Sequence, residues 1–482
     1  NFQPLIVLVG LLGSKGPHLA SLMEAAGDGL DAPLLGAGAA GKRKPLLPLY
    51  LMTMLSATAF CIARLPALSL RFQDLAKEEG FDTAATAIAF GQMTALRSIL
   101  EFVCTPLIAA WSDRIGRRPA IFFCLSAFCV ECTLLAGARS LLALASIHVL
   151  GGLFSDGNGA LEHSCIADAT PPAQRAVAFG RLLTCVGCAM VMGPMIGGEL
   201  ASRWGHEASF LFAAAVLVVT LGYTALLLPE YLPLERRALA PQRAAAGNGD
   251  GAGQTRQLLR ELQSLTRKSP QLAWYLAAMG FANVGMGAYG SVQPFWAREE
   301  LGWAARDLGR YMSFTGLIVI VAQGGLLPLL RNMVKGQEGR LAQCCFLLNA
   351  VKVAALGFAP NTASVYAISV AGVASSCGGT VTRSLTSRCA SEQQQGLLAG
   401  GISALLAAAQ TLGALVGSQA LAAALRRGFP SGAPLQLSAV CFALAALCVA
   451  RAPAAARAAK YEEAAKPLEE GGGDVHEAAK IR

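Results

Sequence analysis

Apolar residues gather in twelve long runs along the chain, and mostly short polar links separate these runs. The runs span residues 46–65, 84–110, 119–138, 141–167, 177–200 and 209–228, then 272–296, 308–330, 341–359, 363–389, 397–425 and 435–450. A membrane-crossing α-helix needs about 20 mostly apolar residues. The pattern therefore predicts an all-α membrane protein with twelve transmembrane helices in two six-helix bundles.

Longer polar segments divide this pattern into five parts. We predict a cytoplasmic segment (1–44), an N-terminal bundle (45–228), a cytoplasmic linker (229–270), a C-terminal bundle (271–451) and a disordered cytoplasmic tail (452–482). In the linker, Leu258, Leu259, Leu262 and Leu265 share one face of a predicted helix over 254–268. That helix either lies on the inner leaflet of the membrane or is a solvated linker helix.

Basic residues mark every second link. They are Lys42, Arg43 and Lys44 before the first run, then Arg114, Arg117 and Arg118, Arg175, the 229–270 linker, Arg331, Lys335 and Arg340, and Arg388 with the tail. Because cytoplasmic loops carry an excess of Lys and Arg, both termini are predicted to be cytoplasmic. The membrane itself is either the plasma membrane or an endomembrane.

The composition supports a membrane protein. The 482 residues are 54% hydrophobic and 14% charged, with a mean hydropathy of +0.49, whereas a soluble domain carries about 25% charged residues. The net charge of +9 arises in the links, which argues against a nucleic-acid partner. The 14 Cys lie inside or at the ends of apolar runs, so we expect small buried hydrophobic residues. No disulfide framework, metal site or cofactor is predicted.

Two motifs give the chain a family resemblance. The link over 109–120 reads AAWSDRIGRRPA and contains Asp113, Arg114, Gly116, Arg117 and Arg118. The fifth run carries spaced small residues and a proline, namely Gly180, Gly193, Pro194, Gly197 and Gly198. With six runs on each side of the linker, these motifs resemble the major facilitator superfamily over about residues 45–451. The first half most resembles its tetracycline-exporter and hippocampus-abundant-transcript branch, which also fits Arg97 and a first span ended by Pro66.

The resemblance implies a conformational latch at the first motif. Gly116 permits a tight turn, and Arg117 is expected to bridge Asp113 and Asp168. In the family such a cluster holds the two halves shut on the cytoplasmic side, where Asp113 faces a helix N-terminus of the other half. The alternative is that the arginines serve only the positive-inside rule.

The second motif resembles a pattern of proton-driven exporters, and its physical effect is close helix packing with a bend at Pro194. Ordinary packing glycines are the alternative. Two departures count against an antiporter, because the fourth run lacks an expected Arg and Ala414 stands where Pro is common.

Ionisable residues inside apolar runs are candidate coupling sites, since charge at membrane depth is costly. Asp156 and His163 are seven residues apart and are predicted to share a helix face. With Glu162 and Glu101 they form the proton-coupling candidates. The alternative is that Glu162 and His163 are simply hydrated near the cytoplasmic end.

Further residues are candidates for the substrate cavity. These are Arg97, Asn158, Arg181, Asn283, Gln293, Gln323 and Arg383. Arg97 either pairs with Glu101 one turn later, meets Asp156 across the cavity, or binds an anionic substrate. Arg383 either holds a substrate anion or marks the cytoplasmic end. Glu131 and Lys352 lie outside the cavity in this fold, and we expect structural roles for them.

These observations predict a secondary transporter that moves a small organic solute by alternating access, proton-coupled and in the direction of export. A uniporter or symporter that imports a sugar or another metabolite is the first alternative. A non-transporting receptor or scaffold with the same fold is the second. No phosphate-binding GxxxxGK[ST] motif or nucleophile arrangement suggests an enzyme. The expected partners are the solute, a proton and the lipid bilayer, and the protein is expected to be a monomer.

Overall fold

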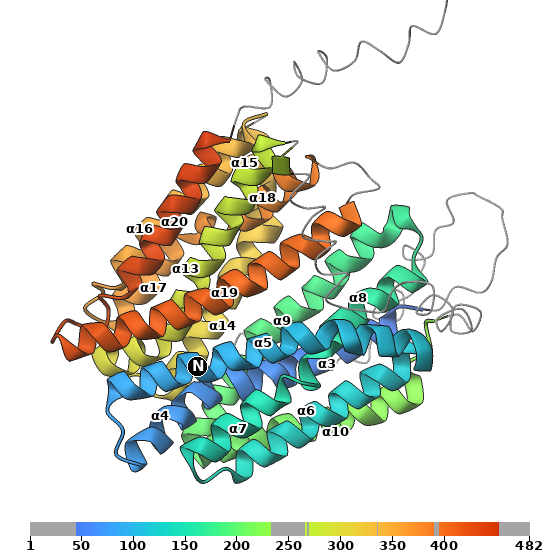
Figure 1. Ribbon diagram of the computed structural model, residues 1–482, viewed down its shortest axis with the longest axis horizontal. Coiled ribbons are helices and arrows are strands. Elements are labelled where there is room, and N and C mark those ends of the chain that lie inside the picture. Colours follow the sequence, from blue (N-terminus) through green and yellow to red (C-terminus); the bar gives the residue numbers. More distant parts are fainter. Residues whose placement is uncertain (1–44, 233–265, 268, 335, 390–394, 453–482) are drawn as a thin grey trace, which may run out of the picture. The chain divides into compact units, whose positions relative to one another are not determined.

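The computed structural model describes residues 45–232, 266–267, 269–334, 336–389 and 395–452, and Figure 1 shows their path. Across these ranges the regular structure is helical and contains no strand. Residues 1–44, most of the predicted helix over 254–268 and the tail after residue 452 lie outside the described residues.

Within the described residues, the helices of each half form six consecutive segments, so the two halves together match the twelve predicted runs. The N-terminal half consists of α3 (Leu47–Ile62), η1 (Ala63–Ala67) and α4 (Leu68–Glu78); α5 (Thr83–Ile115); α6 (Arg117–Gly137); α7 (Leu141–Gly151), η2 (Ser155–Gly157) and α8 (Asn158–Ala169); α9 (Pro172–Trp204); and α10 (His206–Leu227). The C-terminal half consists of α13 (Pro270–Leu301); α14 (Ala305–Val321), η3 (Ala322–Leu326) and α15 (Leu327–Met333); α16 (Glu338–Leu356); α17 (Thr362–Ala371), η4 (Val373–Cys377) and α18 (Gly378–Ser387); α19 (Gln395–Arg426); and α20 (Leu435–Arg451).

Length and composition support membrane crossing for many of these segments. Within the described residues, eight helices are long and apolar enough to span, and a ninth is added if the bent pair α17 and η4–α18 counts as one span. The remaining segments are shorter, broken or less apolar. The fold class is that of an all-α membrane protein.

The first segment differs from the expectation that Pro66 ends it. The helix continues through Pro66 to Glu78, because the five residues of η1 widen into a π-helical turn. A π-turn accommodates a residue that cannot donate a backbone hydrogen bond. The same turn places Arg64 toward the interior of the N-terminal half.

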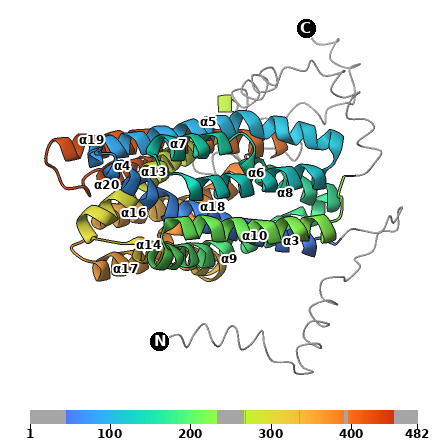
Figure 2. The same cartoon turned by 90° about the horizontal axis from the view of Figure 1, so that it is seen from below.

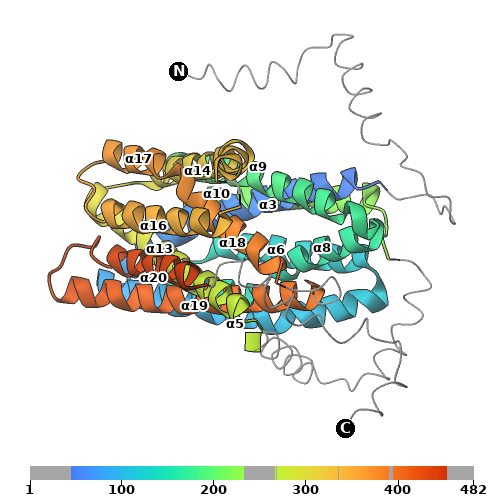
Figure 3. The same cartoon turned by 90° about the horizontal axis from the view of Figure 1, so that it is seen from above.

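Among the described helices, two pairs make most of the contacts between the halves: α5 with α19, and α9 with α14. Figures 2 and 3 show these pairs on opposite sides of the bundle. Small residues allow the close approach. A Cβ at Gly91 would lie 2.0 Å from the Ser418 hydroxyl, and one at Gly309 would lie 2.3 Å from the Pro194 carbonyl oxygen. The halves therefore meet backbone to backbone where α9 crosses α14, and α5 approaches a small Ser side chain of α19.

The spaced glycines of α9 divide their contacts between two neighbours. Cβ atoms at Gly193 and Gly197 would lie 2.3 Å from Cys61 and 2.6 Å from the Ile62 carbonyl oxygen, whereas one at Gly198 would lie 2.4 Å from the Ala305 carbonyl oxygen. Gly180 differs, since a Cβ there would meet nothing within 4 Å. Close packing therefore requires glycine at three of the four predicted positions.

Polar contacts between the halves gather where α4 and α13 finish, and we call this the joined end. Arg298 lies 2.6 Å from Asp74, and the Thr83 hydroxyl donates to Glu299 over 3.2 Å. The Phe90 and Phe295 rings pack edge to face with centroids 5.7 Å apart. The described structure is therefore held together at this end.

The 14 cysteines all fall within the described residues and are free thiols. Eight of them are buried, as expected for small hydrophobic residues. Cys344 is exposed, which makes it an exception to the predicted burial.

Candidate functional site

A cluster of charged side chains lies inside the N-terminal half, at the break in the fourth segment. Arg64 comes from η1, Arg97 from α5, Glu131 from α6 and Asp156 from η2. The four side chains are between 2% and 10% exposed. We call these four residues the four-charge cluster.

Each arginine of the four-charge cluster contacts both acids. Nη atoms of Arg64 lie 2.6 Å from Asp156 and 3.0 Å from Glu131. Nη atoms of Arg97 lie 2.6 Å from Asp156 and 2.8 Å from Glu131. Two positive and two negative charges balance, so each buried charge is paired and hydrogen-bonded, as burial requires.

Neutral groups complete the cluster. The Ser155 hydroxyl donates to Glu131 over 2.7 Å and accepts from Arg97 over 3.1 Å. His148 Nδ1 lies 3.2 Å from Glu131. Gly151 lets the fourth segment approach, since a Cβ there would lie 2.3 Å from a Glu131 oxygen.

The cluster decides between the alternatives for Arg97. Its contacts are with Asp156 and Glu131 rather than with Glu101 on its own helix. Glu101 is partly buried and within electrostatic range of Asp156. Glu131 is expected to lie outside the cavity and to have a structural role, and the structure places it between the two arginines.

Glu162 has a different environment from the clustered acids. Its side chain is buried in α8, where Asn158 Nδ2 donates to it over 2.5 Å and Thr53 of α3 lies beside it. Among the described residues, no Arg or Lys lies within ion-pair distance of Glu162. The alternative that Glu162 is simply hydrated is therefore wrong for this structure.

His163 does not join Asp156 in a common site. Its side chain is exposed and stacks on Phe179 with centroids 5.3 Å apart. Asp156 lies in the 3-10 turn η2, which interrupts the α-helical spacing that the shared face assumed. Asp156 instead faces the arginines of the neighbouring segments.

The remaining cavity candidates are scattered. Arg181 and Arg383 are exposed, and Asn283 donates to the Met279 carbonyl of its own helix over 2.9 Å. Gln293 is buried and its Nε2 has no hydrogen-bond partner among the described residues. Gln323 donates to the Ser376 carbonyl over 3.0 Å. The structure thus does not bring these residues into one site.

The break in the tenth segment is the C-terminal counterpart of the fourth. α17 and η4–α18 meet there at 55°, and Gly372 sits where a Cβ would be 2.5 Å from the Lys352 side chain. Lys352 Nζ donates to the Ser375 hydroxyl over 3.0 Å. Within the described ranges, no carboxylate lies at ion-pair distance from Lys352. This break therefore carries one cation where the other carries a balanced cluster.

The predicted latch residues form a bridge at the opposite end from the joined end. Gly116 turns the chain with φ +112°, and Arg117 lies 2.6 Å from Asp113 and 3.0 Å from Asp168. The Asp113 side chain is 50% exposed, whereas Arg117 and Asp168 are each 9% exposed. Arg114 is exposed. These contacts lie within the N-terminal half.

Residues after the sixth segment complete this bridge. Glu230 accepts from the backbone N–H groups of Arg117 and Arg118 over 2.9 and 3.1 Å, which satisfies the open N-terminus of α6. Arg118 Nε donates to the Thr224 carbonyl over 3.2 Å, which satisfies the end of α10 in the same way. The turn therefore joins the ends of four helical segments.

A bridge of opposite sign occupies the same place in the C-terminal half. Glu338 at the start of α16 lies 2.7 Å from Arg331 and 2.8 Å from Arg388. Arg331 and Arg388 are 40% and 59% exposed. One acid between two bases thus replaces one base between two acids.

Sequence reasoning overlooked several members of these sites. Arg64, Ser155, His148 and Glu230 were not singled out, although Arg64 and His148 are ionisable residues within apolar runs. That signal alone was sufficient to name them. Ser155 and Glu230 carry no such signal, because hydroxyls and loop acids are common.

Comparisons with known proteins place this geometry in context. The family model of the Major Facilitator Superfamily matches residues 45–417. Tetracycline resistance protein, class E, of Escherichia coli is 36% identical over 133 residues, covering 28% of this chain and 32% of that protein. Major facilitator superfamily domain-containing protein 10 of Homo sapiens is 34% identical over 141 residues, covering 29% of this chain and 30% of that protein. The chain thus spans about a third of the length of these two relatives.

Solved structures share the fold. The crystal structure of the human organic anion transporter MFSD10 (TETRAN) aligns with a TM-score of 0.55 and 21% identity, over 84% of this chain and 98% of that chain. A POT family transporter in complex with thioalcohol conjugated peptide aligns with a TM-score of 0.64 and 12% identity, over 85% and 96%. At these identities the likeness concerns the fold.

Proposed function

Because the chain belongs to the Major Facilitator Superfamily, a family of transporters, we propose that it is a proton-coupled exporter that exchanges a small organic solute for H⁺ by alternating access. Two helical halves meet through α5 with α19 and α9 with α14, as a rocking mechanism requires. The relatives named for tetracycline resistance and for organic anion transport support a small organic molecule as the solute.

The observation that carries proton coupling is the contrast between two kinds of buried acid in the N-terminal half: Asp156 and Glu131 of the four-charge cluster, and Glu162 in the fourth segment. Asp156 and Glu131 each face two arginines, which hold a carboxylate in its charged form. Glu162 is buried beside Asn158 and away from any described cation. A carboxyl that carries a coupling proton must change between its charged and neutral forms, and Glu162 faces no described cation that would hold it charged. We therefore assign the coupling proton to Glu162.

The four-charge cluster has a different role in this proposal. It fixes the break of the fourth segment against α5 and α6, and thereby positions Asn158 and Glu162 in the following helix. Reorientation of the halves would then change the surroundings of Glu162 without separating the clustered charges. Arg181 and Arg383, which are exposed, are proposed contacts for an anionic group of the solute.

The described conformation fits one step of the cycle. With both termini in the cytoplasm, the joined end faces away from the cytoplasm, so the site would open to the cytoplasmic side. The bridge at Arg117 then reassembles against the other half when that side closes. Impermeant labelling of the termini checks this orientation.

The test is solute flux in proteoliposomes. Solutes are first selected by thermal stabilisation of the purified chain, and their uptake is then measured with and without a pH gradient. Uptake that follows the gradient supports the proposal. Flux that ignores the gradient indicates a uniporter, and absence of flux for bound solutes indicates a receptor.

A further inference from the structure

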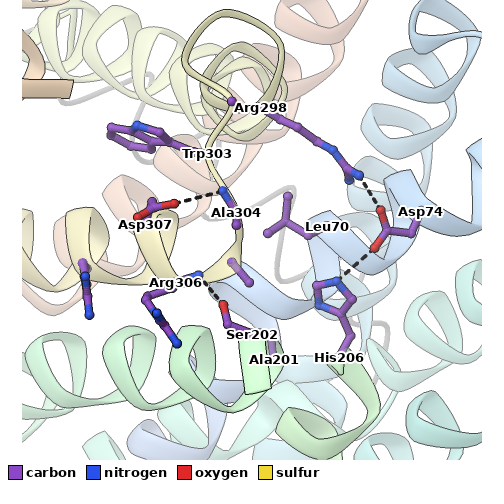
Figure 4. Close-up of a pocket in the computed structure, with 13 residues that line it drawn as sticks. Leu70, Asp74, Ala201, Ser202, His206, Arg298, Trp303, Ala304, Arg306 and Asp307 are labelled. Carbon is purple, nitrogen blue, oxygen red and sulfur yellow. Dashed lines mark hydrogen bonds and ion pairs between the residues drawn. The ribbon is translucent and has the colours of Figure 1, made fainter. Parts of the chain in front are cut away.

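A cavity of about 780 Å³ lies at the joined end, between the two halves. Asp74, Ser202 and His206 line it from the N-terminal half, and Arg298, Arg306 and Arg310 line it from the C-terminal half. Figure 4 labels Asp74, Ser202, His206, Arg298 and Arg306 around the opening, with Arg298 and His206 both directed at Asp74. The cavity is distinct from the four-charge cluster and from Glu162.

Arginines outnumber carboxylates on and directly behind the wall that α9 and α14 form: Arg203, Arg306 and Arg310 against Glu199 and Asp307. Among the described residues, Glu199 is the only carboxylate that lies within 4.0 Å of these three arginines. Its distances are 2.7 Å to Arg203, 2.9 Å to Arg306 and 4.0 Å to Arg310. Arg306 and Arg310 are 40% and 57% exposed, so their guanidinium groups remain open to the cavity. A single carboxylate cannot satisfy the donors of three guanidinium groups.

The opposite wall is already neutral. Asp74 lies 2.6 Å from Arg298 and 3.0 Å from His206 Nε2, which compensates Arg298. His206 Nδ1 is buried and has no hydrogen-bond partner among the described residues. The Asp307 carboxylate belongs to the first wall, since it lies on α14 with Arg306 and Arg310, and it accepts from the Ala304 N–H over 3.2 Å.

We propose that this cavity binds a small anion with two or more negative charges, held by Arg306 and Arg310. Planar guanidinium groups bind carboxylates and phosphates through paired hydrogen bonds. Because both halves line the cavity, a bound anion stabilises the conformation in which they touch here. This second part rests on the proposed alternation between conformations.

The test is calorimetric titration of the detergent-purified full chain with citrate and with pyrophosphate at constant ionic strength. Arg310→Gln and Arg306→Gln should each weaken binding about tenfold, as expected for loss of a charge-assisted contact. Arg203→Gln is the matched control, because Arg203 contacts the same carboxylate but does not line the cavity. It should weaken binding less than about twofold, because Arg203 is 54% exposed to solvent that screens its charge and it does not reach the cavity.

Two results would overturn the site: no binding of either anion to the unmodified chain, or equal weakening by Arg310→Gln and Arg203→Gln. Preference for citrate or for pyrophosphate identifies the carboxylate or phosphate class. Thermal unfolding without anion shows that each variant is folded. Binding is measured without transport, so a chain that binds citrate but moves no solute refutes the proposed function and leaves this site intact.

Discussion

The breaks in the fourth and tenth segments occupy equivalent places in the two halves but hold charge differently. At the first break, Arg97 joins two acids and a second arginine in a balanced cluster. At the second break, Lys352 contacts only a hydroxyl among its described neighbours. Buried charges are stable when paired, so the first break is a fixed element and the second is free to adjust. We therefore expect the break in the N-terminal half to be more rigid than the break in the C-terminal half.

The bridges at the other end repeat this contrast with inverted sign. Arg117 and Asp168 are 9% exposed, whereas the arginines on Glu338 are 40% and 59% exposed. Exposed pairs contribute little, while buried partners depend on each other. The N-terminal half is therefore expected to lose more stability in each matched pair of substitutions.

The largest expected difference is between Arg97→Ala and Lys352→Met. The first leaves two buried carboxylates with one arginine and should lower the free energy of unfolding by roughly 3–5 kcal/mol. The second removes an unbalanced cation while keeping apolar volume and should change it by less than about 1 kcal/mol. Denaturant unfolding in detergent measures both. Equal losses would show that the two breaks do not differ.

Substitutions of the glycines at the two breaks should differ less in their effect on the free energy of unfolding. In Gly151→Ala the new methyl group meets the fixed Glu131 carboxylate, and we expect a loss of about 1–3 kcal/mol from overpacking. In Gly372→Ala it meets the Lys352 methylenes, which can move aside, so the loss should stay below about 1 kcal/mol. The same unfolding measurement applies, and a larger loss for Gly372→Ala would contradict the account.

Substitutions in the two bridges should show the smallest difference in the free energy of unfolding. Arg117→Gln leaves the buried Asp168 without this cation, at a cost of about 1–3 kcal/mol. Glu338→Gln breaks exposed pairs and should cost less than about 1 kcal/mol. Thermal unfolding of both variants checks the order. A greater loss for Glu338→Gln would remove the distinction between the two bridges.

Much of the fold follows from the sequence, because twelve apolar runs leave few alternatives to twelve helical segments. The contacts of Arg117 with Asp113 and Asp168 were also predicted, because the resemblance of the 109–120 link to the family's motif implied them. The four-charge cluster was predicted only in part. Its partners lie 34 to 92 residues apart in the chain, and helix spacing gives no information about such distant contacts.

Breaks in helices explain the main errors. The π-turn at Pro66 and the 3-10 turn at Asp156 change which way side chains point. The regular α-helical spacing that pairs Asp156 with His163 does not hold across such a turn. Burial of Glu162 depends on the packing of neighbouring segments, which a single sequence does not specify.

In the proposed mechanism Glu162, and not the clustered Asp156, carries the coupling proton. The direct measurement compares solute exchange with pH-driven accumulation in proteoliposomes containing Glu162→Gln. We expect exchange to continue and accumulation to fall to the level without a gradient, while Asp156→Asn, which disturbs the cluster, should lower both. Accumulation that still follows the pH gradient in Glu162→Gln would contradict the account.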